Sequence, residues 1–287
     1  MCLLVAILAY FLLILFLSTL LFPMPVNDSG VVRYRTIPWV TLLLIVVNTM
    51  VFALWIAPDL YGQQEAGIAI QPTFEDYVGK VNTYGFNEQT LRQGTGIVAL
   101  ATFSSMFMHA DFWHLFGNMV FLWAFGRRVE DACGSWRFLL FYLLAGMVAN
   151  VGSVLFNPKL DTLPSIGASG AISGVMGAYL LLFPGTWVNS LWGVGTILRI
   201  PYAAIRKLTT SDPDYKFWRW TVPLPAWLVL IWFVVRSFLP SLETIRSDEE
   251  IQGINHLAHL AGFLGALTVF FFVRKDLLLR YLHGRSL

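Results

Sequence analysis

The sequence predicts an all-α, polytopic membrane protein with six core transmembrane helices and one extra N-terminal helix. Three observations lead to this fold class. Of the 287 residues, 57% are hydrophobic and only 13% are charged, which is about half the charged fraction of a soluble domain. Long apolar runs recur along the chain, and basic residues gather in every second loop between them. The formal net charge is only +2, so charge gives no indication of a nucleic-acid partner.

Seven apolar runs have the length that a membrane-spanning helix needs, roughly 17–25 residues. They cover residues 2–22, 38–57, 103–126, 137–156, 168–184, 222–240 and 256–273. The first run has no basic stretch before it and no small-residue cleavage site after it, so it does not resemble a signal peptide. It is either an extra transmembrane helix over 1–23 or the result of an early start, since Met24 could also initiate the chain.

The loops alternate in their content of Lys and Arg, which predicts their orientation. The basic segments, expected in the cytoplasm, are 24–37, the turn after residue 126, the loop 185–221 and the tail 274–287. The loops poorer in Lys and Arg, expected outside, are 58–102, 157–167 and 241–255. The core then covers 38–273. Its outer loop 58–102 is too long for a simple connection, so we expect a structured element there, in the outer interface.

A glycine-rich stretch at 164–174 places Ser169 at the start of the apolar run 168–184. That run is about 25 Å long as a helix, shorter than the roughly 30 Å hydrocarbon core, so its outer end should lie below the membrane surface. Non-helical backbone at such depth needs protein or water around it, and we expect a water-filled cavity. The free N–H groups of the helix start could bind an oxyanion. The alternative is that Ser169 only caps or packs the helix.

Four of the five histidines lie in two of the predicted spans, where ionisable groups usually face the bundle interior. Small residues form one face on each of two helices: Gly170, Gly174 and Ala178, and Ala258, Gly262 and Ala266. Such faces allow close backbone approach. If they meet, His259 can reach Ser169 and act as its general base. His256 is an equal candidate from the chemistry alone, and a neutral histidine bonded to another helix is the alternative.

His114 and Asn118 are four residues apart on one helical face and could donate to a developing oxyanion. A polar pair that bonds between helices is the alternative. His109 is expected near the outer interface. Asp111 is expected near the outer interface with His109, and no other acidic residue lies in the spans near these groups, so the sequence supports a Ser-His dyad and no triad. The stretch around Ser169 is not a G-x-S-x-G nucleophile elbow, because position 171 is Ala.

Several stretches together resemble the rhomboid family of intramembrane serine proteases. His114-Leu115-Phe116-Gly117-Asn118 is similar to the family's H-x-x-x-N motif. Gly167-Ala168-Ser169-Gly170 is similar to its G-x-S-G motif, and Ala258-His259-Leu260-Ala261-Gly262 to its A-H-x-x-G motif. The three motifs lie on three separate spans in the order that the family has, within residues 38 to 273. The resemblance implies a six-helix rhomboid core.

The resemblance further implies Ser169 as nucleophile and His259, rather than His256, as general base. It implies His114, Asn118 and backbone N–H groups of the serine turn, at Gly167 and Ser169, as oxyanion donors. The implied reaction is hydrolysis of a peptide bond in or near a transmembrane segment of another membrane protein, without metal or organic cofactor. The motif style is that of bacterial members and places the chain in a bacterial inner membrane. Some members carry an aromatic residue four positions after the serine, where this chain has Ser173, so what orients His259 stays open.

The sequence offers two alternative functions. An inactive rhomboid-like protein would bind transmembrane helices without cutting them, but loss of the serine or the histidine would then be expected, and both are present. A metalloprotease or metal transporter would use the histidines at 109, 114, 256 and 259 as ligands. However, the sequence has no H-E-x-x-H motif and, apart from Asp111 near the outer interface, no carboxylate in those spans. Cys2 and Cys133 are far apart and without a partner motif, so neither a disulfide framework nor a thiolate metal site is expected.

Overall fold

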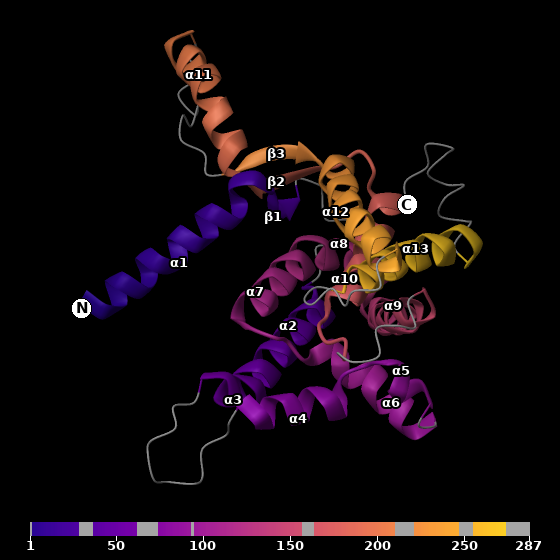
Figure 1. The fold of residues 1–287 in the computed structure, drawn as a ribbon. Coiled ribbons are helices and arrows are strands. Elements are labelled where there is room, and N and C mark those ends of the chain that lie inside the picture. The colour runs from indigo at the N-terminus through magenta and orange to yellow at the C-terminus, as the bar shows by residue number, and fades with distance from the viewer. Residues whose placement is uncertain are drawn as a thin grey trace. The chain divides into compact units, whose positions relative to one another are not determined.

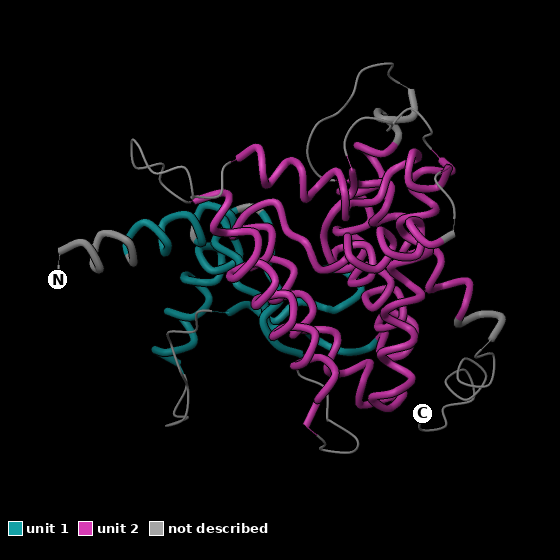
Figure 2. Tube along the Cα trace, turned by 90° about the horizontal axis from the view of Figure 1, so that it is seen from below, with its two compact units in different colours: residues 1–30, 185–229 teal, residues 31–184, 230–287 magenta. Residues whose placement is uncertain are grey.

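The computed structural model is mostly helical, with one small sheet (Figure 1). It describes residues 2–28, 37–61, 74–92, 95–156, 164–209, 221–246 and 255–273. The chain divides into two compact units, coloured in Figure 2. Unit 1 contains residues 1–30 and 185–229, and unit 2 contains residues 31–184 and 230–287. The expected tail 274–287 lies outside the described residues.

Unit 2 is helical. Its helices are α2 (Trp39–Val51), α3 (Ala57–Tyr61), α4 (Phe74–Tyr84), α5 (Glu88–Arg92), α6 (Thr95–Ser104), α7 (Phe112–Phe121), α8 (Arg127–Cys133), α9 (Ser135–Phe156), α10 (Ser169–Leu182) and α13 (His256–Val273). Helix α12 (Ala226–Arg246) begins in unit 1 and enters unit 2 at Leu230. Two π-helical turns, Phe52–Ile56 and Leu122–Gly126, join α2 to α3 and α7 to α8.

Two stretches are long and apolar enough to cross a membrane, Trp39–Tyr61 and Ser135–Phe156. Several apolar helices are shorter, among them Ser169–Leu182, Ala226–Ser241 and His256–Val269. Helix length within the described residues therefore does not confirm the predicted number of six core spans. Helix α2 and the π-helical turn after it expose a stripe of large apolar side chains at three- and four-residue spacing, Leu43, Val46, Met50 and Leu54. Such a stripe suits contact with lipid.

The predicted continuous span 103–126 is wrong. Helix α6 ends in a 3-10 turn at Ser105–Phe107, and α7 begins only at Phe112. Asp111 has an extended backbone, and its carboxylate accepts a hydrogen bond from His114 N at 2.9 Å. This is an N-cap, which satisfies one of the free N–H groups of the new helix. The break gives His109 a place in the buried turn between the two helices.

A buried carboxylate holds the start of α2. Glu130 accepts hydrogen bonds from Val40 N at 3.0 Å and from Thr41 N and Thr41 Oγ1, both at 2.8 Å. It also accepts one from Ser135 Oγ at 2.6 Å. The first N–H groups of a helix have no partner inside it, and the N-cap residue Pro38 offers no side-chain acceptor. Glu130 therefore ties α2, α8 and α9 together.

Unit 1 corrects the all-α expectation, because it contains a three-stranded antiparallel sheet in the order β1-β2-β3. The strands are β1 (Met24–Asp28), β2 (Trp187–Leu191) and β3 (Val222–Pro225). Prolines, which cannot donate to a sheet, occur only in the two edge strands. Helices α1 (Cys2–Leu21) and α11 (Gly193–Thr209) complete the unit, together with the start of α12.

Candidate active site

The backbone before Ser169 is not helical, and three other parts of unit 2 hold it in place. Ser165 exchanges two backbone hydrogen bonds with Phe86, of 3.0 and 2.7 Å. Gly167 N donates to Ser105 O at 2.8 Å. Asn255 Nδ2 donates to Ser165 Oγ at 3.2 Å. These contacts hold the turn, while Ser165, Gly167 and Ser169 stay half-exposed. Irregular backbone inside a membrane needs protein or water around it.

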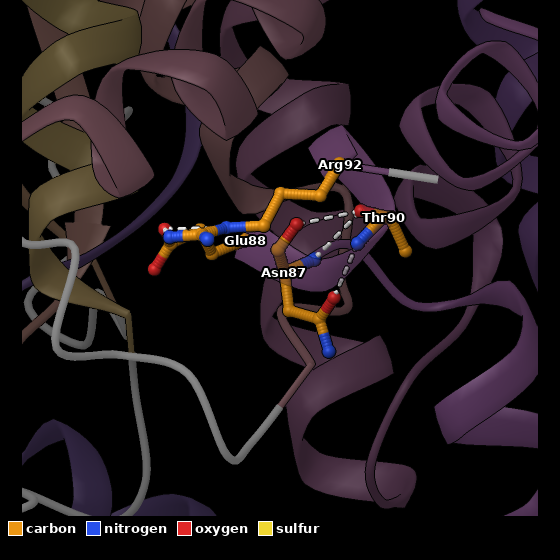
Figure 3. Close-up of polar contacts among 4 residues, drawn as sticks. All are labelled: Asn87, Glu88, Thr90 and Arg92. Carbon is orange, nitrogen blue, oxygen red and sulfur yellow. Dashed lines mark hydrogen bonds and ion pairs between the residues drawn. The ribbon is translucent and has the colours of Figure 1, made fainter. Parts of the chain in front are cut away.

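The bridge to Phe86 is itself supported by a local cap, drawn in Figure 3. Asn87 Oδ1 accepts from Thr90 N at 2.9 Å, and Asn87 N donates to Thr90 Oγ1 at 3.2 Å. An ion pair between Glu88 and Arg92 follows on the same helix, α5. These contacts belong to the loop 58–102, in which a structured element was expected and helices α4 to α6 are found.

Gly167 has a conformation that only glycine adopts readily, with φ of 123°. A Cβ at this position would lie 2.8 Å from both Nε2 and Cε1 of His114 and 3.7 Å from Ser169 Oγ. The His114 imidazole and the Ser169 hydroxyl therefore both lie around the space that a side chain would fill. The N–H of Gly167 already donates to Ser105, so the expected role of Gly167 as an oxyanion donor does not fit this hydrogen bond.

The predicted small-residue faces of α10 and α13 meet. A Cβ built on Gly262 would lie 2.2 Å from Gly170 O, and one on Gly174 would lie 3.3 Å from Gly262 O. Ser169 directly precedes Gly170, and His259 lies one turn before Gly262, so both are near the closest approach of the two helices. No hydrogen bond between Ser169 Oγ and the His259 ring is among those of the described residues, and their direct contact stays a prediction.

His259 is 8% exposed and packs against an aromatic ring that the sequence did not single out. Its ring centroid lies 5.6 Å from that of Phe233 on α12, with 33° between the planes. Ser173, four positions after the serine, bonds within its own helix, where its Oγ donates to Ser169 O at 2.7 Å. Phe233 thus supplies an aromatic face to His259. Helix α12 is uniformly apolar from Ala226 to Val235, so no pattern distinguished this residue.

His114 and Asn118 lie on one face of α7, as predicted, and each side chain has an N–H group that can donate a hydrogen bond. Ala110 N donates to His114 Nδ1 at 3.5 Å, so the ring proton belongs on Nε2, the atom beside Gly167. Asn118 is 8% exposed, and its Nδ2 has no hydrogen-bond partner among the described residues. A buried amide donor without an acceptor is costly, and the expected role of Asn118 as an oxyanion donor stays a prediction.

His109 is fully buried within the protein, and its expected place near the outer interface of the membrane stays a prediction. Its ring centroid lies 5.1 Å from that of the His114 ring. The His256 ring lies 5.9 Å from that of His259. Within the described ranges, no three His, Cys, Asp or Glu side chains are arranged to hold a metal ion.

The fold and the site define a class of protein. It is a helical membrane protein in which the turn before Ser169, helix α13 with His259, and helix α7 with His114 and Asn118 come together. A Rhomboid domain family model matches residues 98–276. The chain therefore belongs to the rhomboid family, whose members are integral membrane proteins.

Relatives from bacteria and from organelles are similar to this chain. It is 47% identical over 73 residues to "Rhomboid protease GluP" of Bacillus subtilis, covering 25% of this chain and 14% of that protein. It is 40% identical over 75 residues to "Putative rhomboid protease YdcA" of the same organism, covering 26% and 37%. It is 33% identical over 146 residues to "Rhomboid protein 1, mitochondrial" of Saccharomyces cerevisiae, covering 49% and 36%. The matches thus span little more than a third of these relatives at most.

Proposed function

We propose that this chain is an intramembrane serine endopeptidase that hydrolyses peptide bonds in or near transmembrane segments of other membrane proteins. The observation that carries the proposal is the contact of α10 with α13 through Gly170 and Gly262. It leaves Ser169 and His259 within one helical turn of the same point, with His114 on the other side of the serine turn. The family's three motifs meet at this point.

In the proposed reaction, Ser169 Oγ attacks the carbonyl carbon of the scissile bond while His259 takes its proton. The oxyanion accepts hydrogen bonds from His114 Nε2, Asn118 Nδ2 and Ser169 N. The first bond within α10 runs from Ile172 N to Ala168 O, so Ser169 N precedes the paired N–H groups. His259 then protonates the leaving amine. In the second half of the reaction water attacks the acyl carbon while His259 takes its proton, and His259 returns that proton to Ser169 Oγ as the ester bond breaks.

The membrane itself is also part of the proposal. Similarity to the two Bacillus subtilis proteins supports a bacterial cell membrane, whereas the yeast relative is mitochondrial by its name. Fractionation of the native host would decide between the two. An inactive rhomboid-like protein that binds transmembrane helices is the second candidate function. The lack of a Ser169–His259 hydrogen bond among the described residues favours it, and both side chains being present disfavours it.

The test is labelling of the detergent-solubilised full chain with a fluorophosphonate probe, followed by cleavage of a model transmembrane substrate. Wild type and Ser173→Ala should be labelled and should cleave, since Ser173 is a matched serine one turn further along α10. Ser169→Ala and His259→Ala should lose both activities. Equal labelling of wild type and Ser169→Ala would refute the assignment of the nucleophile. Absence of labelling and cleavage in wild type, with an active relative labelled alongside, would favour the inactive binder.

A further inference from the structure

Helix α11 (Gly193–Thr209) lies in the long loop that the sequence left without a role, and its two faces differ sharply. At 100° per residue, one side carries Val194, Ile197, Leu198, Ile205 and Leu208. The opposite side carries all three basic residues of the helix, Arg199, Arg206 and Lys207. The helix has no acidic residue. A strong apolar face opposite a face whose charged residues are all basic is the pattern of helices that lie in a membrane interface.

The apolar face is uncovered by the rest of unit 1. Ile197, Leu198, Ile205 and Leu208 are 54%, 70%, 64% and 88% exposed. Side chains of this size are seldom left together in water on a soluble surface. In a chain of the rhomboid family, which is embedded in a membrane, the adjacent apolar phase is the bilayer.

The start of α11 is tied to the end of a helix of membrane length. Helix α1 has 20 residues without a charged side chain, so it is about 30 Å long, the thickness of the hydrocarbon core. A Cβ on Gly193 would lie 3.0 Å from Cα of Leu20, so α11 begins where α1 ends. Figure 1 shows the two helices diverging from the sheet of this unit. A helix that leaves the end of an apolar helix begins at the level of the lipid headgroups.

We propose that α11 docks flat onto the anionic leaflet of the membrane, with Leu198 and Ile205 in the acyl region and Arg199, Arg206 and Lys207 among the headgroups. Charge complementarity chooses this occupant over a second protein. Basic side chains at a membrane surface each favour anionic lipid about fivefold, and three of them without an acidic neighbour on the helix make the preference strong. The proposal does not depend on the proteolytic function.

The test uses the full chain in nanodiscs, in a Cys2→Ser, Cys133→Ala background. Single cysteines at Leu198→Cys and Lys207→Cys carry a bimane label. These positions are nine residues apart and so face opposite sides of the helix. We expect label at 198 to be quenched by lipid with brominated acyl chains and shielded from aqueous iodide, and label at 207 to show the reverse. Ile205→Cys repeats the test on the apolar face in case Leu198→Cys perturbs docking.

The lipid charge gives the second readout. With phosphatidylglycerol in the disc, shielding at 198 should be stronger than in pure phosphatidylcholine. Reversal of the three charges, Arg199→Glu, Arg206→Glu and Lys207→Glu together, should abolish that difference. Equal iodide quenching at the apolar and basic positions would overturn the proposal. Shielding that does not respond to lipid charge, or that requires two copies of the chain per disc, would overturn the anionic leaflet as the occupant.

Discussion

Replacing Gly262 with alanine tests the contact on which the proposed active site depends. The added methyl group would lie 2.2 Å from Gly170 O, whereas real Cβ contacts are essentially never under 3.0 Å. The obstacle is a backbone carbonyl, which cannot rotate away, so α10 and α13 must separate by about 0.8 Å. Overpacking of this kind typically lowers the free energy of unfolding by about 1–3 kcal/mol. Misplacement of catalytic groups by about 1 Å can cost roughly 100-fold in rate.

The assay is a denaturant titration in detergent together with the rate of fluorophosphonate labelling. Gly117→Ala in α7 is the matched control, because a Cβ there meets no atom within 4 Å, and it should be neutral or slightly stabilising. We expect Gly262→Ala to lose stability and to label roughly 100-fold more slowly. A Gly262→Ala variant as stable and as reactive as Gly117→Ala would refute the close contact of the two helices.

Three further substitutions test the surroundings of this contact. Glu130→Gln should lower the free energy of unfolding by about 3 kcal/mol, since it replaces a charged acceptor of four hydrogen bonds; an unchanged denaturation midpoint would contradict this. Asn255→Asp keeps the acceptor for the α13 N-terminus but loses the donor to Ser165, so labelling should slow. Ser165→Ala should slow it equally, and the double variant no further; additive losses would show that the two side chains act separately. Phe233→Leu should slow labelling up to about tenfold, which corresponds to the free energy of one aromatic contact. Helix content measured by circular dichroism should not change. An unaffected labelling rate would mean that Phe233 does not position His259.

The small-residue faces were predictable because their periodicity is local. Gly170 and Gly174 lie four residues apart on one helix, and Ala258 and Gly262 lie four residues apart on the other. A close helix pair follows from that spacing. The three motifs added the identity of the family. His114 and Asn118 could be placed on one face for the same local reason.

Features that depend on distant segments were not predictable. The three strands are four or five residues long and come from parts of the chain more than 30 residues apart, so no local pattern announces them. The helix break within the apolar run 103–126 could not be predicted from hydropathy, because the break depends on a single capping residue, Asp111. Phe233 becomes notable only when α12 lies beside His259.

The hydrogen bond between Asn255 and Ser165 joins residues that are 90 positions apart. A ribosome adding about 5–20 residues per second would finish the serine turn several seconds or more before it makes this partner. Throughout that interval the growing chain holds Ser169 without His259 and without the side chain that fixes Ser165. Synthesis order thus delays completion of the proposed dyad until α13 is made, and a chain cut short before α13 would lack the proposed general base.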